Sequence, residues 1–438
     1  MTNVIRRALY ISPLSNFLVA VIYSYIYSYV FSNHMVGVWG YTLRGSYHAL
    51  GGFDYIIYLL ISALPFVLYK GIRYFASSFS LFIYIFIYIP FLYSLSFFSY
   101  PDNIRYPYIV FFFIIMVCYF LTDKYALFKN TVITNKRKIP FSFIPRITII
   151  LMIFIVLLNI SQLHFVNFFE DAQEMYEYRA SANIRAIYIL CWLRAVFLPL
   201  LMVYYLYKKY YIRSALTFIG FILIFMLDQQ KMTILMPFAI AAIVFAIKYY
   251  ESNFKTSFHL FLIGLFVVIP LFIMRFDENP LASVFSLIFI YRIQCIAGKQ
   301  MLAYLDFFDI RHNPYTYFSH INIVNDITGM YPYSLSIGEA INNGEANSNA
   351  TFFLMDGVAS AGLMGCVIVG ILFVFIKSIL NSLSFVYKVP LLTAIFLFPL
   401  QSLMNVSLFT SLFTHGMIVL FLILYFVDIK SLRNNKIV

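Results

Sequence analysis

Residues 79–98 read FSLFIYIFIYIPFLYSLSFF, twenty consecutive residues without a charged side chain. An α-helix needs about 20 such residues to cross the hydrocarbon core of a bilayer. Lipid contains no water to pair with backbone groups, so a crossing segment must satisfy its own hydrogen bonds, as a helix does. This stretch therefore predicts a transmembrane helix.

The same pattern recurs along the whole chain. Of the 438 residues, 63% are hydrophobic and 11% are charged, too few charges to cover the surface of a soluble protein of this size. We predict an all-α polytopic integral membrane protein that lies in a lipid bilayer. About twelve spans are expected, near residues 10–31, 55–69, 79–98, 108–122, 147–163, 184–206, 214–227, 232–247, 258–274, 357–376, 389–405 and 408–427.

The basic residues predict the orientation of these spans. With both termini in the cytoplasm, 20 of the 30 Lys and Arg residues fall on the cytoplasmic side, as the positive-inside rule requires. The net charge of +12 is then a consequence of membrane topology, and nucleic acid is not expected as a partner.

The ten remaining basic residues differ in type from those inside. Eight are Arg and two are Lys, and Arg is preferred where a planar group must hold a pair of phosphate or carboxylate oxygens. We predict an anion-binding site at the outer surface; the alternative is that these residues pair with nearby acids such as Glu170 and Glu174. The candidates are Arg292, Arg194, Lys231, Arg179 and Arg275.

One large segment, roughly 275–356, separates the spans of residues 1–274 from those of residues 357–438. On the predicted topology it lies outside. Its apolar part, Leu281–Ala297, predicts an interfacial or re-entrant helix. The polar parts are rich in Asn, Tyr and Ser, whose amide and hydroxyl groups both donate to and accept from sugar hydroxyls, although an ordinary solvated loop has a similar composition.

Several chemistries have no support in the sequence. Walker, GxGxxG, HExxH and GxSxG motifs are absent, and the four cysteines show no CxxC spacing. We therefore expect neither a cofactor nor a metal ion.

Three features resemble the Wzy family of oligosaccharide repeat-unit polymerases, which is related to the O-antigen ligases. Asn349–Gly357 followed by Gly362–Gly365 is similar to the tail of the large periplasmic loop in that family. Tyr291-Arg292, followed by a helix through Tyr304, resembles its arginine-bearing loop helix, and Gln230-Lys231 resembles its tight outer hairpin.

The resemblance implies a fold of the integral-membrane glycosyltransferase (GT-C-like) type. It also implies an enzyme of the bacterial inner membrane that joins repeat units carried on undecaprenyl diphosphate into O-antigen or capsular polysaccharide, with a chain-length regulator protein as a further partner. The related ligases have a His near the position of Thr351. This chain has none there, which weakens an assignment as a ligase. The hairpin residue is Lys231 where the family usually has Arg.

The proposed chemistry requires two kinds of residue. Cationic groups would stabilise the diphosphate as it leaves, and a carboxylate or His would accept the proton of the attacking hydroxyl. The candidates for this base are Asp356, Glu339 and His320, with a helix cap as the alternative role for Asp356. The alternative function is a lipid-linked oligosaccharide flippase, but the two related halves typical of such a transporter are not found.

Overall fold

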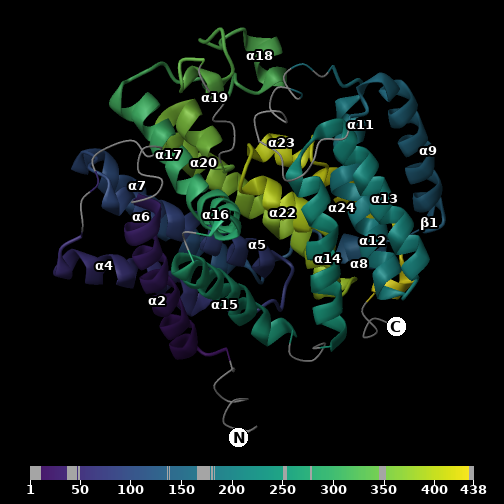
Figure 1. Cartoon of the computed structure of the whole chain (residues 1–438), viewed down its shortest axis with the longest axis horizontal. Helices are drawn as coiled ribbons and strands as arrows, with labels where there is room; N and C mark the ends of the chain where they lie inside the picture. The colour runs from purple at the N-terminus through teal and green to yellow at the C-terminus, as the bar shows by residue number, and fades with distance from the viewer. Residues whose placement is uncertain are drawn as a thin grey trace, which may run out of the picture. The chain divides into compact units, whose positions relative to one another are not determined.

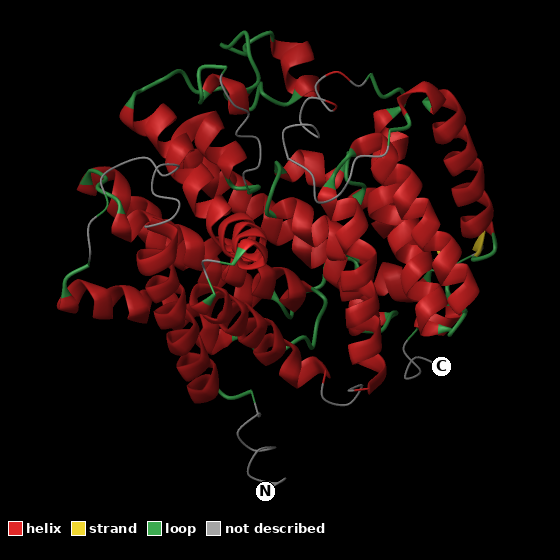
Figure 2. Cartoon of the chain, in the orientation of Figure 1, coloured by secondary structure: helices red, strands yellow, loops and turns green. Residues whose placement is uncertain are grey.

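The computed structural model describes residues 11–36, 47, 50–135, 137, 139–164, 178, 181, 183–249, 254–276, 279–344 and 352–433. These residues are mainly helical (Figure 2). Ten of the described helical stretches are long and apolar enough to cross a membrane, and Gly52–Leu68 and Phe143–Leu158 are shorter apolar helices. The all-α polytopic membrane class is therefore confirmed.

Two of the predicted segments differ from the structure. Pro280–Ile310 is one continuous helical stretch of 31 residues, long and apolar enough for a span, whereas we predicted a shorter interfacial or re-entrant helix in this region. Residues 389–405 were predicted as one span but form two short helices, because the helix is interrupted at Phe396 (φ −86°, ψ 10°). Hydrophobicity alone predicts neither where helices join nor where they break.

The chain divides into two compact units. Unit 1 comprises Met1–Tyr125, Lys255–Ile379 and Leu403–Leu408, and unit 2 comprises Ala126–Phe254, Leu380–Ser402 and Phe409–Val438.

The helices of unit 1 come from both halves of the sequence (Figure 1). They are α2 (Pro13–Val30), η1 (Phe31–Met35), α4 (Gly52–Ala63), η3 (Leu64–Leu68), α5 (Ala76–Ile83), η4 (Tyr84–Tyr88), α6 (Ile89–Phe97), α7 (Asp102–Thr122), α15 (Phe254–Arg275), α16 (Pro280–Phe285), η7 (Ser286–Cys295), α17 (Ile296–Leu305), η8 (Asp306–Ile310), α18 (Asn322–Thr328), α19 (Ile337–Ala340) and α20 (Met355–Asn381).

Unit 2 contains the remaining helices and one pair of short strands. The elements are α8 (Lys129–Thr134), β1 (Ile139–Pro140), α9 (Phe143–Leu158), η5 (Ile160–Gln162), α11 (Ile187–Trp192), η6 (Leu193–Phe197), α12 (Leu198–Tyr207), α13 (Tyr211–Asp228), α14 (Lys231–Tyr249), η9 (Ser382–Phe385), α21 (Val389–Ile395), α22 (Leu397–Leu403), α23 (Leu408–Leu412), α24 (Met417–Phe426), β2 (Val427–Asp428) and η10 (Lys430–Leu432). Strands β1 and β2 pair in parallel.

The uncharged stretch 79–98 forms the core of unit 1. Residues 79–97 lie in the consecutive helices α5, η4 and α6, and every residue of the stretch is buried. A helix that is apolar on all sides is expected in such a central position. Gly298 of α17 allows a close approach to α6, because a Cβ at this position would lie 2.7 Å from the carbonyl oxygen of Pro90.

Candidate functional site

Helix α20 consists of two helices joined by a break at Ala361 and Gly362. Ala361 (φ −162°, ψ 35°) and Gly362 (φ 58°, ψ −138°) are not helical, and the left-handed conformation at position 362 favours glycine. The helix before the break packs directly on the helix after it, since a Cβ on Gly365 would lie 2.0 Å from the carbonyl oxygen of Gly357. A second helical segment therefore follows the break at Gly362, within the span predicted at 357–376.

The break fastens the preceding loop to the helix. The backbone N–H of Thr316 donates to the carbonyl of Ala359 (2.8 Å), and that of Tyr317 donates to the carbonyl of Ser360 (3.1 Å). A helix end leaves such carbonyls without intrahelical partners. The loop after η8 satisfies them, so its residues have fixed positions at the break.

Two of the three predicted base candidates, His320 and Asp356, lie together at this break. The Nε2 atom of His320 is 3.6 Å from Oδ1 of Asp356, and its Nδ1 atom is 2.8 Å from the hydroxyl oxygen of Thr316. Because the Thr316 hydroxyl donates to the carbonyl of Ala359 (3.1 Å), its oxygen accepts from Nδ1–H of His320. This turns Nε2 toward the carboxylate of Asp356, where it is buried and has no hydrogen-bond partner among the described residues.

Asp356 has a second role in the fold. Its Oδ2 atom accepts a hydrogen bond from the backbone N–H of Leu408 (2.9 Å), the first residue of α23. The carboxylate therefore holds the backbone of Leu408, which belongs to unit 1, while its other oxygen faces His320. Asp356 also lies in the first turn of α20, so our alternative interpretation, a cap on its own helix, stays a prediction.

Glu339, the third base candidate, has local partners. Its Oε2 atom accepts from the hydroxyl (2.8 Å) and the backbone N–H (3.2 Å) of Ser336, which makes the pair a capping box for α19. These bonds give Glu339 a structural role at the start of this short helix.

Asp309 was missed by the sequence analysis. Its Oδ2 atom accepts from the hydroxyl of Tyr108 (2.6 Å) in α7, and its Oδ1 atom accepts from the hydroxyl of Tyr315 (2.8 Å). Burial, together with the hydrogen bond to Asp309 and the charge of Asp309, raises the pKa of Tyr315, so its hydroxyl stays protonated and donates. The signal in the sequence was a carboxylate at the end of an apolar helix, shortly before a Tyr-rich loop.

The predicted cationic residues fall in both units. Arg292 lies in η7 and Arg275 ends α15, both with exposed side chains in unit 1. Lys231 begins α14 in unit 2 and is half-buried. Arg179 lies outside the described residues. The role of these four residues in binding a donor stays a prediction.

Arg194, the fifth cationic candidate, lies in a buried polar cluster of unit 2. Its Nη1 atom is 2.6 Å from Oδ2 of Asp228, and the two side chains are 1% and 4% exposed. Asp228 also accepts from the hydroxyl of Thr233 (2.9 Å) and the backbone N–H of Gln230 (2.9 Å). The Nη2 atom of Arg194 lies 3.4 Å from Nδ1 of His415. This network holds together helices that are distant in the sequence, and its charges neutralise each other.

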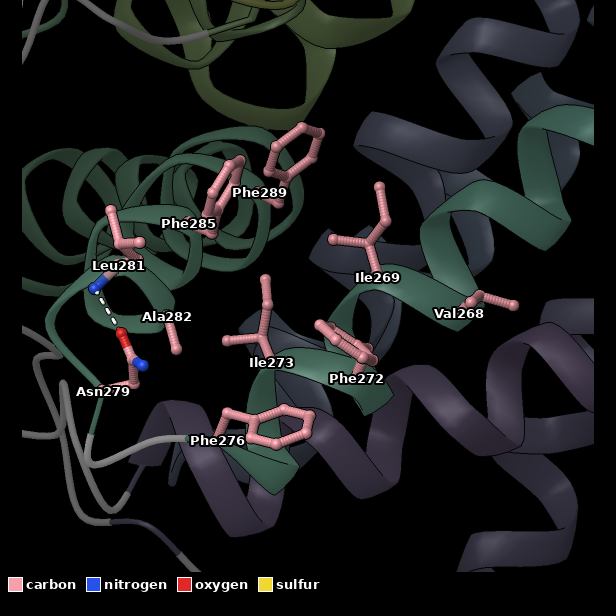
Figure 3. Close-up of a pocket in the computed structure, with 10 residues that line it drawn as sticks. All are labelled: Val268, Ile269, Phe272, Ile273, Phe276, Asn279, Leu281, Ala282, Phe285 and Phe289. Atoms are coloured by element: carbon pink, nitrogen blue, oxygen red, sulfur yellow. Dashed lines mark hydrogen bonds between the residues drawn. The ribbon is translucent and has the colours of Figure 1, made fainter.

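An apolar groove of about 500 Å³ lies between α15 and the start of the 280–310 helix in unit 1. In Figure 3, Ile269, Ile273 and Phe272 of α15 face Phe285 and Phe289 across it. The complete lining is Val268, Ile269, Phe272, Ile273, Phe276, Asn279, Leu281, Ala282, Phe285 and Phe289. Such a lining suits a hydrocarbon chain and has little capacity to bind a polar group.

Comparison with protein-family models, with curated proteins and with solved structures gives no match.

Proposed function

We propose that this protein is a glycosyltransferase of the GT-C-like type that polymerises oligosaccharide repeat units carried on undecaprenyl diphosphate. Its products would be O-antigen or capsular polysaccharide, made at the periplasmic face of the bacterial inner membrane. The observation that carries the proposal is the pairing of His320 with Asp356 at 3.6 Å. It supports a site for proton removal at the junction between the large loop and the helix after it.

The proposed reaction requires one bond to form and one to break. A hydroxyl oxygen of the acceptor repeat unit attacks the anomeric carbon of the donor, and the bond from that carbon to the phosphate oxygen breaks. The hydroxyl proton would pass to Nε2 of His320, which is buried in this structure and becomes accessible only when the acceptor displaces the groups around it, and Asp356 would stabilise the imidazolium that forms. Undecaprenyl diphosphate leaves with the electron pair, so neither ATP nor a nucleotide is consumed.

The lipid chain and the diphosphate of the donor would bind to different residues of the protein. The groove between α15 and α16 is apolar, which suits an isoprenoid chain. Arg292 lies three residues after the groove residue Phe289, and Arg275 directly precedes the groove residue Phe276. Exposed arginines that are close in sequence to the residues of an apolar groove match a ligand with a long hydrocarbon tail and an anionic head.

The arrangement of unit 1 supports a periplasmic loop. In Figure 1 the first turns of α2 and α15 lie on the side of unit 1 opposite to α18 and α19. With the N-terminus in the cytoplasm, as we propose, the loop would lie outside. A reporter fused after Asn343 is expected to give a periplasmic signal, and one after Lys209 a cytoplasmic signal. A cytoplasmic signal at Asn343 would contradict the proposal.

Deletion of the gene tests the function. A strain that lacks the protein is expected to carry a single repeat unit on its lipopolysaccharide or capsule anchor, where the parent shows a ladder of long chains. Complete loss of repeat units would favour a flippase, and an unchanged ladder would exclude both functions.

Arg292 tests the proposed donor site. Loss of a charge-assisted contact to a developing charge lowers the rate by about a hundredfold, so Arg292→Ala is expected to abolish long chains with normal protein levels. Arg292→Lys is expected to restore little if the contact is bidentate. Arg311→Ala is the control, since this exposed arginine pairs with Asp306 (2.7 Å). Long chains in Arg292→Ala would remove this residue from the site.

A further inference from the structure

The surroundings of Asp309 differ from those of the other loop carboxylates. Asp306 pairs with Arg311 (2.7 Å), and Asp356 faces His320 and a backbone N–H. The partners of Asp309 are two phenolic hydroxyls, at 2.6 Å and 2.8 Å. Within the part of the chain that the structure describes, no basic side chain lies within ion-pair distance of Asp309. Its charge is therefore stabilised by neutral O–H donors.

This environment leaves hydrogen-bonding capacity for a ligand. An ionised carboxylate offers about four lone-pair sites, of which Tyr108 and Tyr315 occupy two. The Asp309 side chain is half-buried, so part of it remains accessible. Alcohol hydroxyls can occupy the remaining sites without breaking an ion pair. A ligand rich in hydroxyl groups matches this chemistry.

Aromatic rings extend from Asp309 along the loop. The ring of Phe308 stacks on that of Tyr315, with centroids 5.9 Å apart and an interplanar angle of 14°. The ring centroids of Tyr331 and Tyr333 are 5.7 Å apart. The three tyrosines are half-buried and present part of their surface outward. The C–H faces of sugar rings are apolar and pack on aromatic side chains, while ring hydroxyls bind carboxylates. A carboxylate beside partly exposed tyrosines fits a carbohydrate.

Asp309 also adjoins the proposed proton-accepting pair. A Cβ on Gly362 would lie 2.9 Å from the hydroxyl of Tyr315 and 3.2 Å from Oδ1 of Asp309, so the break in α20 directly underlies both groups. Thr316, the residue after Tyr315, binds His320. A sugar held at Asp309 would therefore lie next to the residues that would accept its proton.

We infer that Asp309, together with Tyr315 and the outer tyrosines Tyr331 and Tyr333, forms a binding subsite for the hydroxyl groups of a carbohydrate, the acceptor repeat unit. This inference rests on the proposed function for the identity of its ligand. The competing explanation is that Asp309 only fastens the loop to α7 through Tyr108.

Direct binding separates these explanations. The probe is the repeat-unit oligosaccharide, released by mild acid from the lipid of the gene-deletion strain and titrated into the purified full-length protein. Loss of a hydrogen bond to a charged group corresponds to roughly a tenfold or larger change in affinity. Asp309→Asn, which keeps the shape of the side chain, is therefore expected to weaken binding about tenfold or more. Asp326→Asn changes an exposed carboxylate of the same loop and is expected to leave affinity unchanged.

Two further measurements make the result decisive. With lipid-linked repeat units as substrate, Asp309→Asn is expected to raise KM for the acceptor about tenfold with kcat changed less than threefold. Its melting temperature is expected to stay close to that of the wild type. Unchanged affinity with a lowered melting temperature would overturn the inference and leave Asp309 a structural tie. If the wild type binds the oligosaccharide through Asp309 but never forms polymer, the proposed polymerase function fails while the carbohydrate subsite stands.

Discussion

The buried polar cluster of unit 2 and the loop site of unit 1, which consists of Asp309, His320 and Asp356, contain similar residue types. They differ in how the charges of those residues are balanced. In unit 2, Arg194 and Asp228 form an ion pair at 2.6 Å with both side chains almost fully buried. In unit 1, Asp309 and Asp356 are held by hydroxyl and backbone N–H donors, and His320 stands 3.6 Å from Asp356. The first cluster neutralises its own charge. The second keeps negative charge and lone pairs available.

This difference indicates how to separate structural from functional polar groups in a membrane protein. Ionisable residues within spans are functional candidates by default, and Arg194 was predicted on that basis. A buried charge with a complete set of partners has a structural role, because removing one partner leaves the other unpaired in a low-dielectric interior. Such a charge needs no functional explanation. A carboxylate whose donors are neutral and whose side chain is half-buried is the stronger candidate for ligand binding.

The largest expected effect is in unit 2. Arg194→Ala leaves Asp228 buried without its cation, which costs about 3–5 kcal/mol of stability. We expect a large fall in the melting temperature of the purified protein and reduced amounts in the membrane. The double variant Arg194→Met, Asp228→Asn removes both charges and is expected to recover most of the loss. A single variant as stable as the wild type would show that the ion pair is not structural and would strengthen the predicted donor role of Arg194.

Asp356→Asn tests the loop site. Asn can still accept from the N–H of Leu408, but it cannot stabilise an imidazolium at His320 by charge. General base catalysis is typically worth 10²–10⁴-fold, so we expect near-complete loss of long chains with normal protein levels, measured from the banding pattern and an immunoblot. A normal ladder would mean that Asp356 does not support proton removal by His320, and His320 would be the next residue to test.

The fold of the break in α20 is tested by a pair of glycine substitutions. Gly365→Ala would place a Cβ 2.0 Å from the carbonyl oxygen of Gly357, and such overpacking typically costs about 1–3 kcal/mol. Gly264 in α15 has nothing within 4 Å of its Cβ position, so Gly264→Ala is expected to be neutral or to stabilise by about 0.5–1 kcal/mol. Thermal unfolding of both variants checks the contrast, and equal melting temperatures would contradict the packing described for α20.

The sequence predicted the membrane class and most spans because uncharged segments of sufficient length have few alternatives in lipid. It predicted the span at 357–376 but not the break within it at Ala361 and Gly362. It did not predict that the helix of residues 281–297 and the helix expected through Tyr304 would form one stretch that continues to Ile310, nor that Arg194 would meet Asp228. Asp309 was missed for the same reason: its partner Tyr108 lies about two hundred residues away in the sequence, and such pairings depend on the tertiary fold.

The smallest expected effect concerns pH. Burial, together with the hydrogen bond to Asp309 and the charge of Asp309, raises the pKa of Tyr315 above the ordinary tyrosine value of about 10. The stability that its protonated hydroxyl contributes is therefore fully present below pH 10 and is lost only as the pH rises toward the raised value. Binding of the free oligosaccharide is expected to be the same at pH 8 and pH 9.5. A fall in affinity with a midpoint below pH 9.5 would show that another group titrates at this subsite.

The most direct test of the account is a cell-free reaction with the purified full-length protein in lipid vesicles and undecaprenyl-diphosphate-linked repeat units. We predict that the wild type releases one undecaprenyl diphosphate for each glycosidic bond formed, as measured by mass spectrometry of lipid and glycan. His320→Gln and Asp356→Asn are predicted to release almost none, and the control Asp326→Asn to match the wild type. Folded wild-type protein that leaves the substrate intact, or His320 and Asp356 variants as active as the wild type, would contradict the central claim that the loop site of unit 1 carries out glycan polymerisation.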